Sequence, residues 1–318
     1  GRVGPRGGRN LRLLVYPYVQ PNGVSQTMSV TQASLTTRIR TWLLLAALSA
    51  LLVGIGALIG GGALYGFIVM AVVMNLVAYW FSDKFALMAS RAKPIEESQA
   101  PELYAMVREL AERFQVPMPR VYLIPSEQPN AFATGRNPGH AVVAVTEGLL
   151  RYLPADQVRG VLAHELAHVR NRDILVASIA AMIAGAISML QYLLFFGVSS
   201  RDRDESPLGA IGAIAALVIG PIAATLLQLA VSRQREYLAD ATAARVLGEG
   251  KPLADALETL ERGRQALPME VNPATASLYI VNPLRGGGLA SLFSTHPPIA
   301  ERVRRLRAYD AARGLHYG

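Results

Sequence analysis

Apolar residues form four long uncharged runs along the chain, arranged as two pairs. The first pair comprises residues 43–59 and 63–81, which three consecutive glycines separate. The second pair comprises residues 174–196 and 208–231, which a short polar loop separates. Each run is close to the roughly 20 residues that an α-helix needs to cross a bilayer. The pattern therefore predicts four transmembrane helices in two hairpins.

Each pair of runs has an alternative interpretation. The first run has the length of a cleaved signal peptide, although no A-x-A-like cleavage site lies between it and the second run. Residues 174–196 and 208–231 could instead be two core helices of a large soluble fold, or insert only partly into the bilayer. Their lengths favour full membrane spans.

The sequence between the two hairpins has the pattern of a soluble α+β domain. Residues 99–114 place apolar side chains at helical spacing, which predicts an amphipathic helix. Residues 119–124 and 140–145 are short β-branched runs, and residues 128–135 form a third extended piece between them. Together they predict a small β-sheet. A helix then begins near Leu153 and continues into the third apolar run.

The chain thus divides into an N-terminal segment, two membrane hairpins and two parts of one soluble domain. Gly, Pro, Arg and Ser are frequent in the N-terminal segment, so we expect disorder there. The predicted boundaries are 1–37 for this segment, 38–81 for spans 1 and 2, 82–173 for the first soluble part, 174–231 for spans 3 and 4, and 232–318 for the second soluble part.

Composition and charge favour a membrane protein over a nucleic-acid-binding protein. Hydrophobic residues make up 52% of the chain, and its mean hydropathy is positive. The net charge of +8 comes from basic residues gathered beside the apolar runs rather than interleaved with aromatic residues. By the positive-inside rule we expect a multi-pass protein of the cytoplasmic membrane, with its soluble parts in the cytoplasm and no nucleic-acid partner. Cysteine is absent, which excludes disulfide bonds and thiolate metal sites.

The helix ahead of the third run contains the motif HExxH. His164 and His168 are four residues apart, so both imidazoles lie on one helix face and can bind a single Zn²⁺. Glu165 lies beside them and can take a proton from water that the zinc activates. The motif predicts a zinc metallopeptidase site near the cytoplasmic membrane surface. The alternative, for so short a pattern, is a chance pair of helical histidines.

A catalytic zinc ion usually has three protein ligands, so one more is needed. Spans 3 and 4 form a hairpin, which returns the residues just outside it to the same side of the membrane. His168 precedes span 3 and Glu236 follows span 4, each by about 7 to 9 Å at about 1.5 Å per helical residue. Glu236 is therefore the candidate third ligand, with Asp240 one turn later. Glu258 and Glu261 are rival ligands, and a solvated helix face is the alternative for Glu236 and Asp240.

Three motifs in order resemble the HtpX family of membrane zinc proteases, relatives of the CAAX prenyl endopeptidases. They are HELAH at 164–168, EYLAD at 236–240 and FSTHPPIAER at 293–302, within a similarity that runs from about Leu35 to about Leu306. The resemblance implies a mainly α membrane protein whose four transmembrane helices carry a cytosolic, zincin-like (gluzincin) α+β catalytic domain. The implied roles are metal ligand for His164, His168 and Glu236, catalytic base for Glu165, oxyanion stabilisation for His296, and a polar pair near the ligand helix for Asp240 and Arg302.

The residues alone leave other roles open for three of these positions. His296 is equally an exposed histidine in a proline-rich turn. Arg302 lies in a run of basic residues that suits a solvated helix or a contact with anionic lipid. Asp240 is a reasonable carboxylate to orient a metal ligand.

Substrate binding is expected at a strand edge. A zincin commonly adds an extended polypeptide to an exposed edge of its sheet, through backbone hydrogen bonds. Asn130 and the strand with Ala141, Val142 and Val143 are the candidates for this edge. The alternative is a hairpin turn at Asn130 with Phe132 in the core.

We therefore expect an integral membrane endopeptidase with one Zn²⁺ per chain. The resemblance implies that it degrades misfolded or damaged membrane proteins on the cytoplasmic side, as part of quality control under stress, with unfolded polypeptides and the lipid bilayer as partners. One alternative is a dedicated processing protease of the CAAX-endopeptidase type. Another is a non-catalytic scaffold with structural zinc, against which Glu165 argues because a structural site needs no general base. The sequence carries no signal for oligomeric state.

Overall fold

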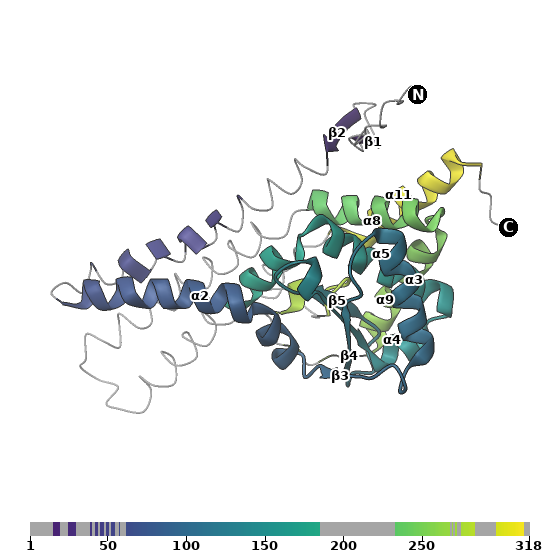
Figure 1. Ribbon diagram of the computed structural model, residues 1–318. Coiled ribbons are helices and arrows are strands. Elements are labelled where there is room, and N and C mark those ends of the chain that lie inside the picture. The colour runs from purple at the N-terminus through teal and green to yellow at the C-terminus, as the bar shows by residue number, and fades with distance from the viewer. Residues whose placement is uncertain are drawn as a thin grey trace, which may run out of the picture.

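The computed structural model describes residues 15–19, 25–29, short stretches between 39 and 57, 62–184, 233–267, 269, 271, 275–283 and 297–314. This described part is mainly helical with a small mixed sheet (Figure 1), as the sequence predicts. Most of predicted spans 3 and 4, much of span 1, and His296 lie outside the described residues.

Helix α2 (Ala63–Ala89) corresponds to the second predicted span. Its residues Leu64–Ala89 form the one described helix that is long and apolar enough to cross a membrane. Val69, Val72 and Leu76 are each more than half exposed, so no protein core covers this part of the helix. Figure 1 shows α2 extending away from the sheet and the other labelled helices. Four spans remain a prediction.

The N-terminal segment contains a hairpin where the sequence suggests disorder. Strand β1 (Val15–Val19) pairs with β2 (Ser25–Ser29) in antiparallel register, with Val15 opposite Ser29. Valine and tyrosine predominate in β1, and both residue types favour strands. The prediction of disorder used the polar composition of the whole segment and did not consider this local preference for a strand.

The main sheet has the strand order β3-β4-β6-β5 and includes the three predicted strands. Strands β4 (Arg120–Ile124) and β6 (Val142–Thr146) are parallel, and β5 (Ala131–Thr134) is antiparallel to β6. The two-residue strand β3 (Lys93–Pro94) was not predicted; it pairs antiparallel with β4. Strand β6 is buried throughout, because it has a neighbour on either side and cores on both faces.

Alternate residues of the sheet enter two hydrophobic cores. Val143 and Val145 of β6 pack in the core that contains helices α3 (Pro101–Phe114) and α5 (Ala155–Asn171). Val142 and Ala144 pack on the other face, with Ala86 and Leu87 from the end of α2. Helix α2 therefore ends directly on the sheet.

Helix α5 lies at the centre of the soluble domain. It contacts strand β5 and helices α3, α8 (Arg233–Leu247) and α9 (Lys251–Ala266), and α11 (Ile299–Ala312) packs on α8 and α9. Gly160 allows the close approach of α9, since a Cβ there would lie 2.6 Å from the Leu253 nitrogen. The remaining short elements are α4 (Glu147–Tyr152), η1 (Pro138–His140) and η2 (Ala276–Leu278).

Helix α5 does not continue into the third apolar run, so the predicted continuous helix is wrong. Arg172 has a left-handed backbone conformation with φ of 62° and ends α5 at Asn171. The Asp173 N–H donates to the His168 carbonyl at 3.1 Å, which closes the turn. A separate helical segment, Ile174–Ala184, follows and is largely buried, unlike α2.

Candidate metal centre and active site

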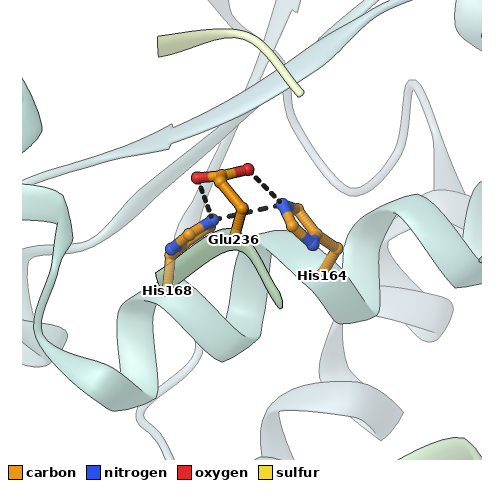
Figure 2. A group of neighbouring side chains, drawn as sticks. All are labelled: His164, His168 and Glu236. Carbon is orange, nitrogen blue, oxygen red and sulfur yellow. Dashed lines mark hydrogen bonds and ion pairs between the residues drawn. The ribbon is translucent and has the colours of Figure 1, made fainter. Parts of the chain in front are cut away.

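Three side chains from two helices converge at one point in the soluble domain. His164 and His168 lie one turn apart on α5, and Glu236 lies in the first turn of α8. Their ligand atoms all lie within 4.8 Å of one another. Figure 2 shows the carboxylate of Glu236 lying across the two imidazoles, with one oxygen directed to each ring.

The separations among these atoms fit a tetrahedral zinc site. The two Nε2 atoms are 3.1 Å apart, and the Glu236 oxygens lie 3.6 Å from His164 Nε2 and 3.5 Å from His168 Nε2. Two ligands at zinc–ligand distances of about 2.0–2.1 Å are about 3.3 Å apart in tetrahedral geometry. Two imidazoles and one carboxylate are also a donor set typical of catalytic zinc.

Each histidine is oriented by a carboxylate behind it. His164 Nδ1 lies 2.8 Å from Asp240 Oδ1, and His168 Nδ1 lies 3.0 Å from Asp173 Oδ2. Because an ionised carboxylate only accepts hydrogen bonds, each Nδ1 carries the proton and each Nε2 lone pair faces the metal position. When neutral, the histidines are thus held in the tautomer that binds a metal ion.

Arg302 fixes Asp240 from the opposite side. Its fully buried guanidinium donates to both Asp240 oxygens, at 2.9 and 2.7 Å, and also lies 3.3 Å from His164 Nδ1. Although burial opposes ionisation, the charge and hydrogen bonds of Arg302 dominate and lower the pKa of Asp240 to about 2. Asp240 therefore remains an anion in the interior of the protein.

Glu165 is buried beside the histidines and is only 2% exposed. Burial raises its pKa above the ordinary value, even though His164 and His168 act in the other direction. The backbone N–H of Ala133 in β5 donates a hydrogen bond to this carboxylate. A carboxylate with a raised pKa next to a metal position is suited to exchange protons with a substrate.

The charge of His164 depends on the acidic groups around it. Burial and Arg302 lower the pKa of this imidazole, but hydrogen bonds to Asp240 and Glu236 outweigh them and raise it to about 9. These partners therefore favour a cation at this position, whether a proton or a metal ion.

The structure brings together His164, Glu165, His168 and Glu236, together with Asp240 and Arg302. The rival ligands lie elsewhere on α9. Glu258 is exposed, and Glu261 forms an ion pair with Arg264 at 2.6 Å.

The strand that contains Val142 and Val143 is not the free edge that the sequence predicts. Ala141 directly precedes β6, and Val142 and Val143 belong to it; this strand pairs with β4 on one side and β5 on the other, so it has no free edge. The outer strand beside the metal centre is β5. Asn130 is 1% exposed, and its amide binds the backbone of Val281.

Two participants were not identified from the sequence. Asp173 is recognisable only once the turn at Arg172 is known, because that turn directs its side chain back to His168. Ala133 contributes a backbone group, which no residue identity can reveal. For Asp173, the only signal in the sequence was the presence of a carboxylate five residues after the second histidine.

Comparisons with known proteins agree with this geometry. The sequence model described as Peptidase family M48 matches residues 97–310. A protease HtpX homologue of Pelotomaculum thermopropionicum is 53% identical over 276 residues, covering 85% of this chain and 98% of the relative. One from Syntrophobacter fumaroxidans is 55% identical over 279 residues, covering 85% and 99%.

A more distant similarity is found among solved structures. The crystal structure of S. mikatae Ste24p matches with a TM-score of 0.46 and 20% identity, covering 87% of this chain and 67% of that one. The family match spans more than half of the chain, and the HtpX homologues align over nearly their whole length. The resemblance seen in the three motifs is confirmed, and the chain belongs to peptidase family M48.

Proposed function

We propose that this protein is a zinc-dependent endopeptidase of the cytoplasmic membrane that degrades misfolded or damaged membrane proteins from the cytoplasmic side. The observation that carries the proposal is the convergence of His164, His168 and Glu236 beside the buried Glu165. Three protein ligands leave a position for water or substrate, whereas a structural zinc site uses four.

The protein's own residues supply the proton transfers. Bound zinc would polarise the scissile carbonyl and lower the pKa of the attacking water. Glu165 takes the proton from that water and later delivers it to the leaving amine. Asp240 and Asp173 hold His164 and His168 in place during both steps. His296, implied by the resemblance to stabilise the oxyanion, lies outside the described residues.

The position of the site supports a membrane substrate. The end of α2 packs against the sheet through Ala86 and Leu87, in the same core as Phe132 of β5. The next residue of β5, Ala133, donates to Glu165. The reacting groups therefore lie close to the C-terminal end of α2, which the proposal places in the cytoplasm. A CAAX-type processing role is the alternative, and nothing in the described residues favours it.

The proposal is tested with the full-length protein purified in detergent. Glu165→Gln should keep its zinc but cleave casein at least about 100-fold more slowly, because general acid–base catalysis contributes about 10² to 10⁴. Glu236→Ala should lose zinc, whereas Glu258→Ala, which alters an exposed carboxylate on α9, should keep it. Cleavage by Glu165→Gln at the wild-type rate would refute the mechanism.

The quality-control role needs a cellular test. Cells that carry Glu165→Gln in place of the wild type should clear a misfolded membrane protein more slowly, as measured by pulse-chase labelling. The turnover of an unfolded soluble protein is the control and should change less. Equal turnover of the membrane protein in both strains would exclude this role.

A further inference from the structure

Among the described strands, β5 has an outer edge beside Glu165 where an extended substrate can pair with the sheet. The Asn130 carbonyl accepts from the Thr146 N–H of β6, and successive residues of β5 direct their backbone groups alternately toward and away from β6. Ala131 and Ala133 therefore direct their backbone groups outward. Ala133 uses its N–H to bind Glu165, which places the catalytic carboxylate on this edge.

A segment of the chain itself occupies the same edge two residues away. The Ile280 N–H donates to the Ala131 carbonyl at 3.0 Å. The Asn130 amide donates to the Val281 carbonyl at 2.7 Å and accepts from the Val281 N–H at 3.4 Å. Arg302 donates to the Ile280 carbonyl at 3.0 Å. Residues 279–281 form a bend rather than a strand, and these contacts hold the backbone of Ile280 and Val281 against β5.

This segment also lies next to the metal centre. The guanidinium that binds the Ile280 carbonyl through Nη1 binds Asp240 through its other nitrogens, and Nη1 is 4.0 Å from a Glu236 oxygen. Arg302 therefore joins the segment directly to the groups that hold the metal ligands.

We propose that residues 279–281 form an autoinhibitory strap, which a polypeptide must displace from β5 before it can be cleaved. The inference rests on the proposed peptidase function and adds a way in which that activity is regulated. Ala131, Asn130 and Arg302 bind backbone and not side chains, so the chain that replaces the strap is recognised by being extended and unfolded rather than by its sequence. A folded protein offers no free strand and leaves the strap in place.

The strap is also connected to the membrane helix. The ring of Tyr279 packs edge-on against Phe132, with centroids 5.1 Å apart. Both rings belong to the core that contains Ala86 and Leu87 of α2. A displacement of α2 relative to the sheet would therefore change the packing under the strap.

Hydrogen exchange tests the strap without altering its sequence. Zinc-loaded, full-length Glu165→Gln protein is saturated with reduced, carboxymethylated α-lactalbumin, and binding is followed by fluorescence anisotropy. Amide exchange in residues 279–281 should become at least tenfold faster when the polypeptide binds. Binding with unchanged or slower exchange would overturn the strap and leave the peptidase function intact. Absence of both binding and wild-type cleavage would refute the proposed function, and the strap with it.

Kinetics of a weakened strap provide a second test. Ile280→Ala removes buried apolar contacts from the strap, so KM for the unfolded polypeptide should fall about fivefold or more while kcat stays similar. Val107→Ala removes an equally buried aliphatic side chain from α3 and should leave KM unchanged. An unchanged or higher KM for a folded, zinc-loaded Ile280→Ala protein would contradict the strap.

Discussion

The histidines of the metal centre depend on carboxylates that do not touch the metal position. Asp240 and Asp173 come from different parts of the chain, yet each accepts the Nδ1 proton of one histidine. Asp240 has a charged partner in Arg302, whereas Asp173 occupies the turn that ends α5. The two orienting contacts thus have different origins, one in long-range packing and one in local backbone geometry.

The Asp173 contact predicts a specific loss of metal affinity. Asp173→Asn should weaken zinc binding by about 10- to 100-fold, because the histidine loses its anionic partner. Competition with a chelator measures the affinity. Asp156→Asn, which changes an exposed residue at the start of the same helix, is the control and should bind zinc normally. Equal zinc affinities for the two variants would show that Asp173 does not orient His168.

The raised pKa of His164 predicts that zinc displaces a proton. The pKa rises from 6.5 to about 9, so at pH 7.5 the metal-free protein carries the imidazolium, whereas zinc requires the neutral ring. Zinc affinity should therefore increase by up to about tenfold per pH unit toward pH 9, with about one proton released per zinc ion. Titration calorimetry in buffers of different ionisation enthalpy measures this release. Affinity independent of pH between 7 and 9 would contradict the prediction.

At the scale of elements, the site depends on how α5 is held by its neighbours. The amphipathic helix at 101–114 and the strands β4, β5 and β6 were predictable, since their apolar periods are clear in the sequence. The strand order was not. Strand β6, which was expected to bind substrate, pairs with both β4 and β5 and is therefore central. Strand β5 precedes it in the chain and is the outer strand of the sheet.

The contact between α5 and α9 predicts the effect of adding one methyl group. Gly160→Ala would place a Cβ 2.6 Å from backbone of Leu253, so the helices must separate and the protein should lose about 1–3 kcal/mol of stability. Thermal unfolding in detergent measures this loss. Gly66→Ala in α2 is the control, because a Cβ there meets no atom within 4 Å. A Gly160→Ala protein as stable as this control would contradict the tight packing.

At the scale of the described molecule, a helix long and apolar enough to cross a membrane packs against the domain that carries the metal-binding side chains. α2 exposes its apolar residues along most of its length, and the C-terminal end packs on the sheet. The proposed orientation puts that end, and the metal centre with it, in the cytoplasm.

Single cysteines can test this orientation because the natural chain contains none. A membrane-impermeant maleimide should label Gly62→Cys in intact cells and Glu112→Cys only after permeabilisation. Val72→Cys should resist labelling in both cases, since a thiol in lipid does not ionise. Labelling of Glu112→Cys in intact cells would reverse the proposed topology.

The sequence by itself determined the family to which the chain belongs, the side chains that form the metal-binding group, and one helix long and apolar enough to cross a membrane. HExxH places two imidazoles together through helical periodicity alone, and the length of an apolar run is sufficient to predict a membrane helix. The hairpin predicted for spans 3 and 4 also selected Glu236 from among several carboxylates. These properties depend on local repeats and run lengths, which the sequence displays directly.

Only the tertiary structure decided which groups surround the metal centre. The left-handed turn at Arg172, the outer position of β5 and the binding of residues 279–281 to Arg302 depend on backbone conformation and on contacts between distant segments. Backbone hydrogen bonds have no residue signature, and buried ion pairs join positions many residues apart. For that physical reason the candidate metal ligands could be predicted from the sequence, whereas their orientation and the proposed strap beside them could not.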